Sequence, residues 1–155
     1  MPNYSVSNTL AGTQQAISAA YKTLVSLTAA TTGLRRGKIS DISLGTNGTP
    51  ADNAMEYDIS RQTAAGTATA ATPNPLDPAD GVSSTVAAVN ATAEPTVTAA
   101  SSVFQIAVNQ RATYRWVASP GSELVWPATN LAGLAVRAKS AAYTGTANAW
   151  TLLSE

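Results

Sequence analysis

The sequence predicts an all-β protein, an antiparallel sandwich or barrel built from short strands. Apolar and polar residues alternate over short segments, as they do in strands that are buried on one face. Gly, Pro and Asn separate these segments, and no long stretch has the apolar spacing of an amphipathic helix. A β-helix is the alternative, which the irregular spacing of the strands disfavours.

Length and composition predict one domain, over residues 21–155, with a thin core. The chain has 155 residues, and much of its 45% hydrophobic fraction is alanine, which buries little area. Large apolar side chains are few, with three Trp, five Tyr, one Phe and two Met. Such a core must be that of a two-sheet sandwich, or a partner subunit must complete it.

The first quarter of the chain predicts a polar arm followed by strands. Residues 1–20 read as a polar N-terminal arm, within which residues 12–20 could form a short helix. Leu24, Val25 and Leu27 predict the first strand, and Ile42 and Leu44 stand two apart in the next.

A turn and a half-buried strand follow. Asn-Gly at residues 47–48 is a turn signal. Beyond it, Met55, Tyr57 and Ile59 alternate with polar residues, which predicts a strand with one face in the core.

The segment "RQTAAGTATAATPNPLDPAD", residues 61–80, has almost no bulky side chain except Leu76. We expect residues 61–70 to extend the strand begun at Met55, with small side chains that let another sheet or subunit approach. Pro73, Pro75 and Pro78 fix φ and make residues 73–80 a stiff connection. We predict that this loop is ordered and lies at a contact with another subunit or with a shell, so these prolines and Leu76 are candidate interface residues.

The second half of the chain predicts further strands. Phe104, Ile106 and Val108 share one face of a strand, and Tyr114 and Trp116 share one face of the next. The remaining predicted strands lie around residues 124–126, 134–138 and 150–152, and the small, Thr-rich stretch 84–102 precedes them.

Composition argues against an enzyme. The chain has no His and no Cys, so the usual neutral-pH acid–base group and the thiolate nucleophile are both missing. The sequence contains no nucleophile-elbow, phosphate-loop or dinucleotide-binding motif. We therefore expect no catalytic residue and no cofactor. A small sugar-active enzyme would need two positioned carboxylates, for which only Asp52 and Asp58 could be proposed.

Charge and hydropathy argue against nucleic acid and membrane partners. Nine basic residues balance nine acidic ones, so no basic field is available for phosphates or anionic lipid. The N-terminus lacks the pattern of a signal peptide, and no apolar stretch is long enough for a membrane helix. We expect a soluble protein.

The acidic residues Asp52, Glu56 and Asp58 lie close together in the sequence and could hold a calcium ion through their oxygens. The spacing of the EF-hand loop is missing, however. We favour the simpler interpretation, in which Glu56 and Asp58 form the solvated face of a strand.

Basic and aromatic residues supply further interface candidates. Arg35, Arg36 and Lys38 form the densest positive group, which fits a charged strand edge, an acidic protein partner or phosphate, in that order of preference. Burial in the core is the favoured interpretation for each of the three Trp residues, and Trp126, beside Pro127 at a strand end, is the best candidate among them for an interface anchor.

Three further arginines have no single assignment from the sequence. They are expected on polar strand faces, paired with Glu123 or Asp58 or facing a neighbouring subunit. These residues are Arg111, Arg115 and Arg137.

Residues 33–155 resemble a family of small virion proteins of tailed bacteriophages. The resemblance is carried by "RRGKISDISLGTNGTPADNAMEYDISRQTAAGTATAATPNPLDPAD", "NATAEPTVTA" and "NQRATYRWVASPGSELVWPAT". Members of this family are associated with capsid decoration, or cement, roles. The resemblance implies a jelly-roll sandwich, a homotrimer, and binding to the major capsid protein on the outer surface of the virion.

Two functions remain open from the sequence. The first is a decoration protein that stabilises the capsid from outside, with its arm lying along the shell. The second is a tail-fibre or spike head domain that binds a host receptor, since a jelly roll serves both. The short polar arm, in place of a stalk or an anchoring domain, favours decoration.

Overall fold

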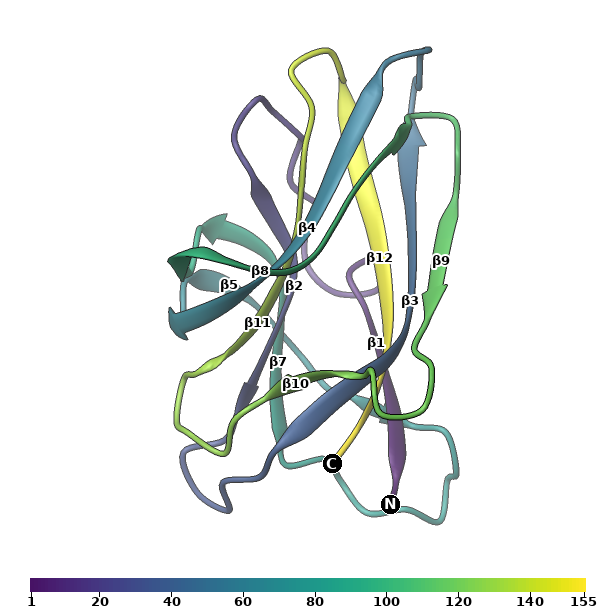
Figure 1. Cartoon of the computed structure of the whole chain (residues 1–155). Helices are drawn as coiled ribbons and strands as arrows, with labels where there is room; N and C mark the ends of the chain where they lie inside the picture. Colours follow the sequence, from purple (N-terminus) through teal and green to yellow (C-terminus); the bar gives the residue numbers. More distant parts are fainter.

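The chain folds into twelve β-strands and no helices in a computed structural model, which describes residues 1–155. The strands form two antiparallel sheets of six strands, packed face to face as a sandwich (Figure 1). The all-β sandwich predicted from the sequence is thus confirmed, while its jelly-roll strand order stays a prediction. No element of the structure is a helix that could span a membrane.

One sheet, sheet A, has the strand order β10-β3-β12-β1-β6, and β9 also pairs with β3. Its longest pairing joins β3 and β12, from Gly48 opposite Gly145 to Lys38 opposite Ser154. The strands of sheet A are β10 (Leu124–Trp126), β3 (Gly37–Gly48), β12 (Gly145–Ser154), β1 (Asn3–Ser7), β6 (Asn74–Pro75) and β9 (Tyr114–Val117).

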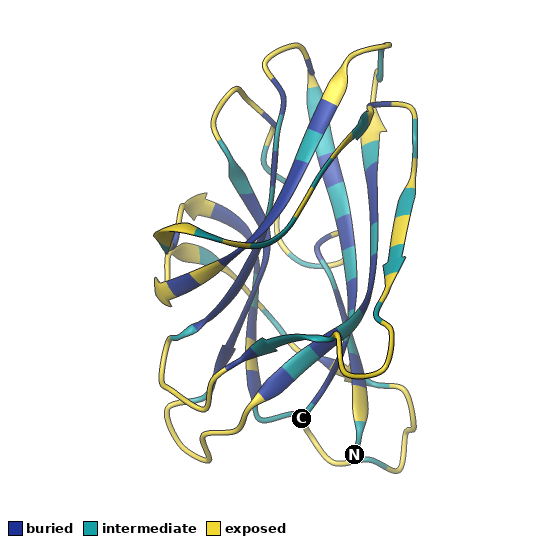
Figure 2. Ribbon diagram, in the orientation of Figure 1, coloured by how far each residue is buried: buried dark blue, intermediate teal, exposed yellow.

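The other sheet, sheet B, has the strand order β5-β7-β2-β11-β4-β8. Its two central strands, β2 and β11, are buried along most of their length, so residues of both faces are shielded from water (Figure 2). The strands of sheet B are β5 (Thr67–Ala71), β7 (Thr85–Ala93), β2 (Lys22–Ala29), β11 (Gly133–Lys139), β4 (Ala54–Ala64) and β8 (Thr96–Asn109).

The core lies between the two sheets, where alternate side chains of each strand meet. Met55, Tyr57 and Ile59 of β4 are fully buried, as their spacing predicts. The hydroxyl of Tyr57 donates a hydrogen bond across the core to the carbonyl oxygen of Gly45 at 2.6 Å. Burial also raises the pKa of the Tyr57 hydroxyl, so this donor keeps its proton.

The N-terminal segment is not an arm separate from the sandwich. Residues of β1 pair with β12 on one side and with β6 on the other, so β1 is an inner strand of sheet A. Tyr4 and Val6 point into the core and are buried, and Ile17 is buried in the helix-free segment that follows β1. Because these apolar side chains need cover, the segment packs as part of the domain.

The Ala- and Thr-rich segment 61–80 makes two strands and joins the two sheets. The predicted extension of β4 is correct as far as Ala64. Beyond Gly66, where a Cβ would collide with the backbone at Ala93 to Pro95, the chain turns back and β5 pairs with β7 instead. The chain then passes from β5, at the edge of sheet B, to β6, at the edge of sheet A.

Aromatic side chains pack between the opposite edges of the two sheets. Phe104 of β8 lies 5.7 Å from the ring of Trp116 and 6.2 Å from the ring of Tyr114, both on β9 (ring centroids). Contacts of this kind add to the burial of apolar area. The sandwich is therefore joined along one side by these rings and along the other by the crossing from β5 to β6.

Candidate interaction surface

Two segments that carry candidate interface residues lie at the same end of the sandwich. The loop 30–36 between β2 and β3 and the loop 76–84 between β6 and β7 both lie at the end that carries the two chain termini (Figure 1). We call this surface the terminal end. Burial and the negative charges of Glu155 and Asp80 raise the pKa of the Tyr4 hydroxyl, while the positive charge of Arg35 acts in the opposite direction.

Hydrogen bonds hold the loop 76–84 against the sandwich. The Leu76 N–H donates to the carbonyl oxygen of Asn3 at 2.9 Å, and the Tyr4 hydroxyl donates to the carbonyl oxygen of Gly81 at 3.0 Å. Within the loop, a side-chain oxygen of Asp77 accepts from the Ala79 N–H at 2.9 Å, which closes a local turn. The loop is thus held to the sandwich at Leu76 and Gly81 and closed internally at Asp77.

The carboxylate of Glu155 fixes the C-terminal side of this loop. It accepts hydrogen bonds from the Ser84 N–H at 2.6 Å, the Ser84 hydroxyl at 2.9 Å and the Thr85 hydroxyl at 2.8 Å. Burial alone would raise the pKa of the Glu155 carboxyl, but these hydrogen bonds outweigh it and lower the pKa. The charged form of Glu155 therefore stabilises the folded loop.

The three predicted basic residues differ in whether an acidic side chain pairs with them. Lys38 of β3 is half-buried and forms an ion pair with Glu123 at 3.1 Å. Arg35 and Arg36 are exposed and take part in none of the chain's ion pairs. Arg36 also lines a hollow of about 210 Å³ that reaches Glu155. The terminal end thus offers two guanidinium groups that remain open to a partner.

Exposed apolar side chains accompany these arginines. Leu76 is 55% exposed and Val82 is 87% exposed, both in the loop 76–84, while Leu34 lies exposed beside Arg35. Pro78 of the same loop is also exposed. A surface that combines apolar side chains with arginine has the composition of a protein interface.

Three predicted interface residues are not available at this surface. Pro73 is buried where the chain crosses between the sheets, and Pro75 is half-buried in β6, opposite Tyr4. Trp126 is fully buried, and its indole packs directly on Gly37, where a Cβ would collide with the ring. Trp126 therefore belongs to the core, and its prediction as an interface anchor is wrong for this chain.

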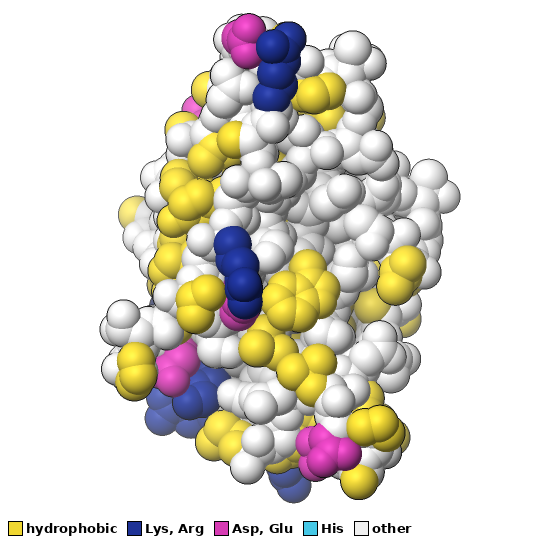
Figure 3. Space-filling model, turned by 90° about the vertical axis from the view of Figure 1, so that its right-hand side faces the viewer, with side chains coloured by type: hydrophobic (Ala, Val, Ile, Leu, Met, Phe, Trp, Pro, Cys, Tyr) yellow, Lys and Arg dark blue, Asp and Glu magenta, His cyan; other side chains and the backbone are white.

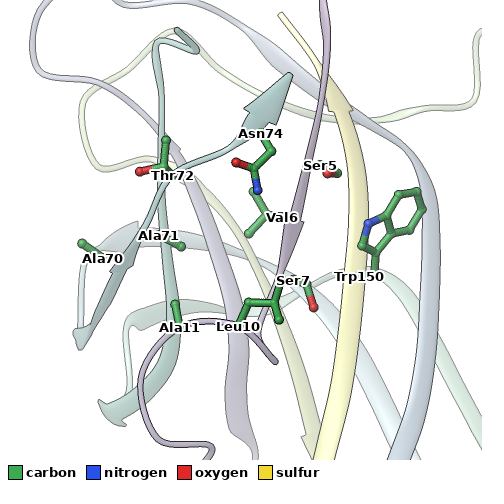
Figure 4. Close-up of a pocket in the computed structure, with 10 residues that line it drawn as sticks. All are labelled: Ser5, Val6, Ser7, Leu10, Ala11, Ala70, Ala71, Thr72, Asn74 and Trp150. Atoms are coloured by element: carbon green, nitrogen blue, oxygen red, sulfur yellow. The ribbon is translucent and has the colours of Figure 1, made fainter. Parts of the chain in front are cut away.

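The Ala- and Thr-rich segment also lines a hollow of about 390 Å³ at the side of the sandwich (Figure 4). Ala70, Ala71 and Thr72 form one wall, and Trp150 and the exposed Leu10 contribute the largest apolar groups. The small side chains of this segment therefore leave space at the surface, as expected from its composition. Sequence reasoning missed Leu10 because the residues around it are polar.

The three clustered carboxylates do not converge on one site. Asp52 pairs with Arg111 at 3.2 Å and Glu56 pairs with Lys139 at 3.1 Å. Asp58 is buried, not solvated, and no group of three potential ligand residues is arranged to hold a metal ion.

Each of the three unassigned arginines has an acidic partner within the chain. Arg137 pairs with Asp58 at 2.6 Å, which confirms the pairing considered from the sequence. Arg115 instead pairs with Asp41 at 2.5 Å, and Arg111 with Asp52. The strand register explains the first pair, because Arg137 of β11 lies directly opposite Asp58 of β4.

No family model, no curated protein and no solved structure matches this chain.

Proposed function

We propose that this chain is a non-enzymatic structural protein of a bacteriophage virion, which binds the outer surface of the capsid and stabilises it. Its partners are the major capsid protein and further copies of the chain, in the homotrimer that the resemblance implies. The observation that carries the proposal is the terminal end, where the loops that carry the exposed side chains of Arg35, Arg36 and Leu76 lie at the same end of the sandwich. The resemblance of residues 33–155 to small virion proteins supports the same function.

The chemistry of the terminal end suits a rigid and repetitive partner. The loop 76–84 is already tied to Asn3, Tyr4 and Glu155, so binding would not have to order it. Arg35 and Arg36 fit an acidic patch beside an apolar one on the shell. Because many copies bind one shell, and copies within a trimer bind together, each contact can be modest in strength.

Charge reversal and loss of the apolar anchor test the proposal. We expect two variants to lower the affinity for phage heads that lack the protein by about tenfold or more. One is the double variant Arg35→Glu with Arg36→Glu, and the other is Leu76→Asp. Co-sedimentation of purified protein with such heads measures this binding.

Matched control variants lie away from the terminal end. Arg111→Glu reverses an exposed arginine beyond β8, near Pro50 and Asp52, and Leu10→Asp alters an exposed leucine beyond β1. Both should bind heads as the wild type does. Wild-type binding by the Arg35/Arg36 and Leu76 variants, or a comparable loss with the controls, would contradict contact through the terminal end.

A further inference from the structure

A second surface feature lies on the outer face of sheet A, where a groove of about 550 Å³ runs over β3 between β9 and β12. The strand register lines up Ser7, Trp150, Ser43 and Arg115 in one row across β1, β12, β3 and β9. Figure 3 views the molecule from this side and shows hydrophobic side chains next to a basic group near the middle of the face. We call this feature the Trp150 groove.

The groove carries no uncompensated charge. Arg115 is its only charged lining residue, and its guanidinium donates from Nε and Nη2 to the carboxylate of Asp41 at 2.5 to 3.1 Å. The Asp41 side chain is only 6% exposed, whereas the Arg115 side chain is 66% exposed and covers it. An anionic ligand would have to compete with Asp41 for the guanidinium, so the groove suits a neutral ligand.

Neutral polar groups surround the indole of Trp150. Ser43 and Thr113 line the groove, and the hydroxyl of each can both donate and accept a hydrogen bond. The side-chain oxygen of Asn148 accepts a hydrogen bond from the Gln14 side-chain nitrogen at 2.8 Å. The side-chain nitrogen of Asn148 therefore remains available as a donor to a ligand. Trp150 is half-buried, so part of its ring faces the groove and offers an apolar surface.

The backbone N–H and C=O groups of β3, beneath the groove, are already paired with neighbouring strands. Strand β3 pairs with β12 on one side and with β9 on the other, so an extended peptide cannot add to the sheet here. The ligand must therefore be recognised through side chains alone, with C–H groups over an indole and hydroxyls at its rim. A groove of this volume lies within the usual range for a small-molecule site.

From these observations we infer that the Trp150 groove binds a neutral saccharide, with a sugar ring on the indole and its hydroxyls bonded to Ser43, Thr113 and Asn148. This binding is independent of the terminal end and adds to the proposed role on the capsid. It would give the outer face of the protein an affinity for surface glycans.

The test follows the indole N–H resonance of Trp150 in ¹H–¹⁵N NMR spectra, assigned by its loss in Trp150→Phe. The probes are the methyl glycosides of glucose, galactose, mannose and N-acetylglucosamine, with their short oligomers. At least one probe should shift this resonance with a Kd of about 1 mM or tighter, while the indole resonance of the buried Trp126 stays in place.

Variants locate the binding. Trp150→Ala, and the milder Asn148→Ala and Ser43→Ala, should each weaken binding by about fivefold or more, while Leu76→Ala at the terminal end should leave it unchanged. If Trp150→Ala fails to fold, the two milder variants decide. Absence of any shift with all probes, or binding that the groove variants do not weaken, would overturn the inference. A Trp150 resonance that responds only to protein concentration would also overturn it, because a second copy would then cover the groove.

Discussion

Asp58 and Asp52 each form an ion pair with an arginine, but the first pair is buried and the second is exposed. The Asp58 and Arg137 side chains are only 4% and 18% exposed, and the guanidinium of Arg137 also stacks on Tyr21, 4.6 Å from the ring centroid. The Asp52 and Arg111 side chains are 73% and 61% exposed. Removal of one partner is costly only where the other is left buried without its counter-charge.

Loss of one partner should therefore lower the free energy of unfolding by different amounts in the two pairs. Asp58→Ala should lower the free energy of unfolding by about 3 kcal/mol, because it leaves the Arg137 guanidinium buried against Tyr21 without its counter-charge. Asp52→Ala should lower it by less than about 1 kcal/mol, as for other exposed pairs. Urea denaturation measures both values, and equal costs for the two variants would contradict this reading of the ion pairs.

The lowered pKa of the Glu155 carboxyl predicts that the stability of the fold depends on pH. Its folded-state pKa lies below the ordinary value of 4.5, so its contribution to stability is full above that value and is lost as the pH falls through the folded pKa. Glu155→Gln should therefore be less stable than the wild type at pH 7, and the difference between them should shrink below about pH 4.5. Denaturation series between pH 3 and pH 8 measure this. A difference that stays constant over the range would show that the carboxylate has no part in holding Ser84 and Thr85.

At the scale of elements, β1 links sheet A to the crossing from β5 to β6. It carries the buried side chains of Tyr4 and Val6, and its loss would leave β6 without its only strand partner. Asn8, just beyond it, is buried and donates to the Ala147 carbonyl oxygen at 2.9 Å. The N-terminal segment is therefore part of what the domain needs to fold.

Deletion of residues 1–8 tests this role. The truncated chain should lose its cooperative thermal unfolding transition, since both the core and a sheet lose a central strand. Circular dichroism and differential scanning calorimetry measure the transition. A truncated chain that melts cooperatively near the wild-type temperature would instead support a detachable arm.

Much of the strand pattern could be predicted from the sequence because alternation is a local signal. Met55, Tyr57 and Ile59 are buried as their spacing indicates, and Phe104 packs toward the core with its neighbours. The strand β1 was missed because only Tyr4 and Val6 alternate within it, between polar residues. The turn at Gly66 was missed because it depends on the close approach of residues 93–95, which no local pattern records.

At the scale of the whole molecule, the candidate site was predictable in its parts but not in its assembly. The basic residues Arg35 and Arg36 and the apolar Leu76 stand out by residue type. Their position at the same end of the sandwich follows from the paths of β3 and β6 through sheet A, which a sequence pattern does not reveal. Burial of Trp126 was unpredictable for a similar reason, since it depends on Gly37 of a strand far away in the sequence.

The terminal end and the Trp150 groove lie on different surfaces of the sandwich, so one molecule can use both. With the terminal end on a shell, the outer face of sheet A would stand to the side or outward, according to how the copies are arranged. Capsid binding and the inferred saccharide binding would therefore use separate surfaces.

Cryo-electron microscopy of the proposed virions tests most directly the central claim that this chain lies on the outer surface of a capsid. The account predicts density for the sandwich on the outside of the head, with Arg35, Arg36 and Leu76 facing the major capsid protein. Density for this chain at the tail tip or on a fibre, or its absence from the particle, would contradict it.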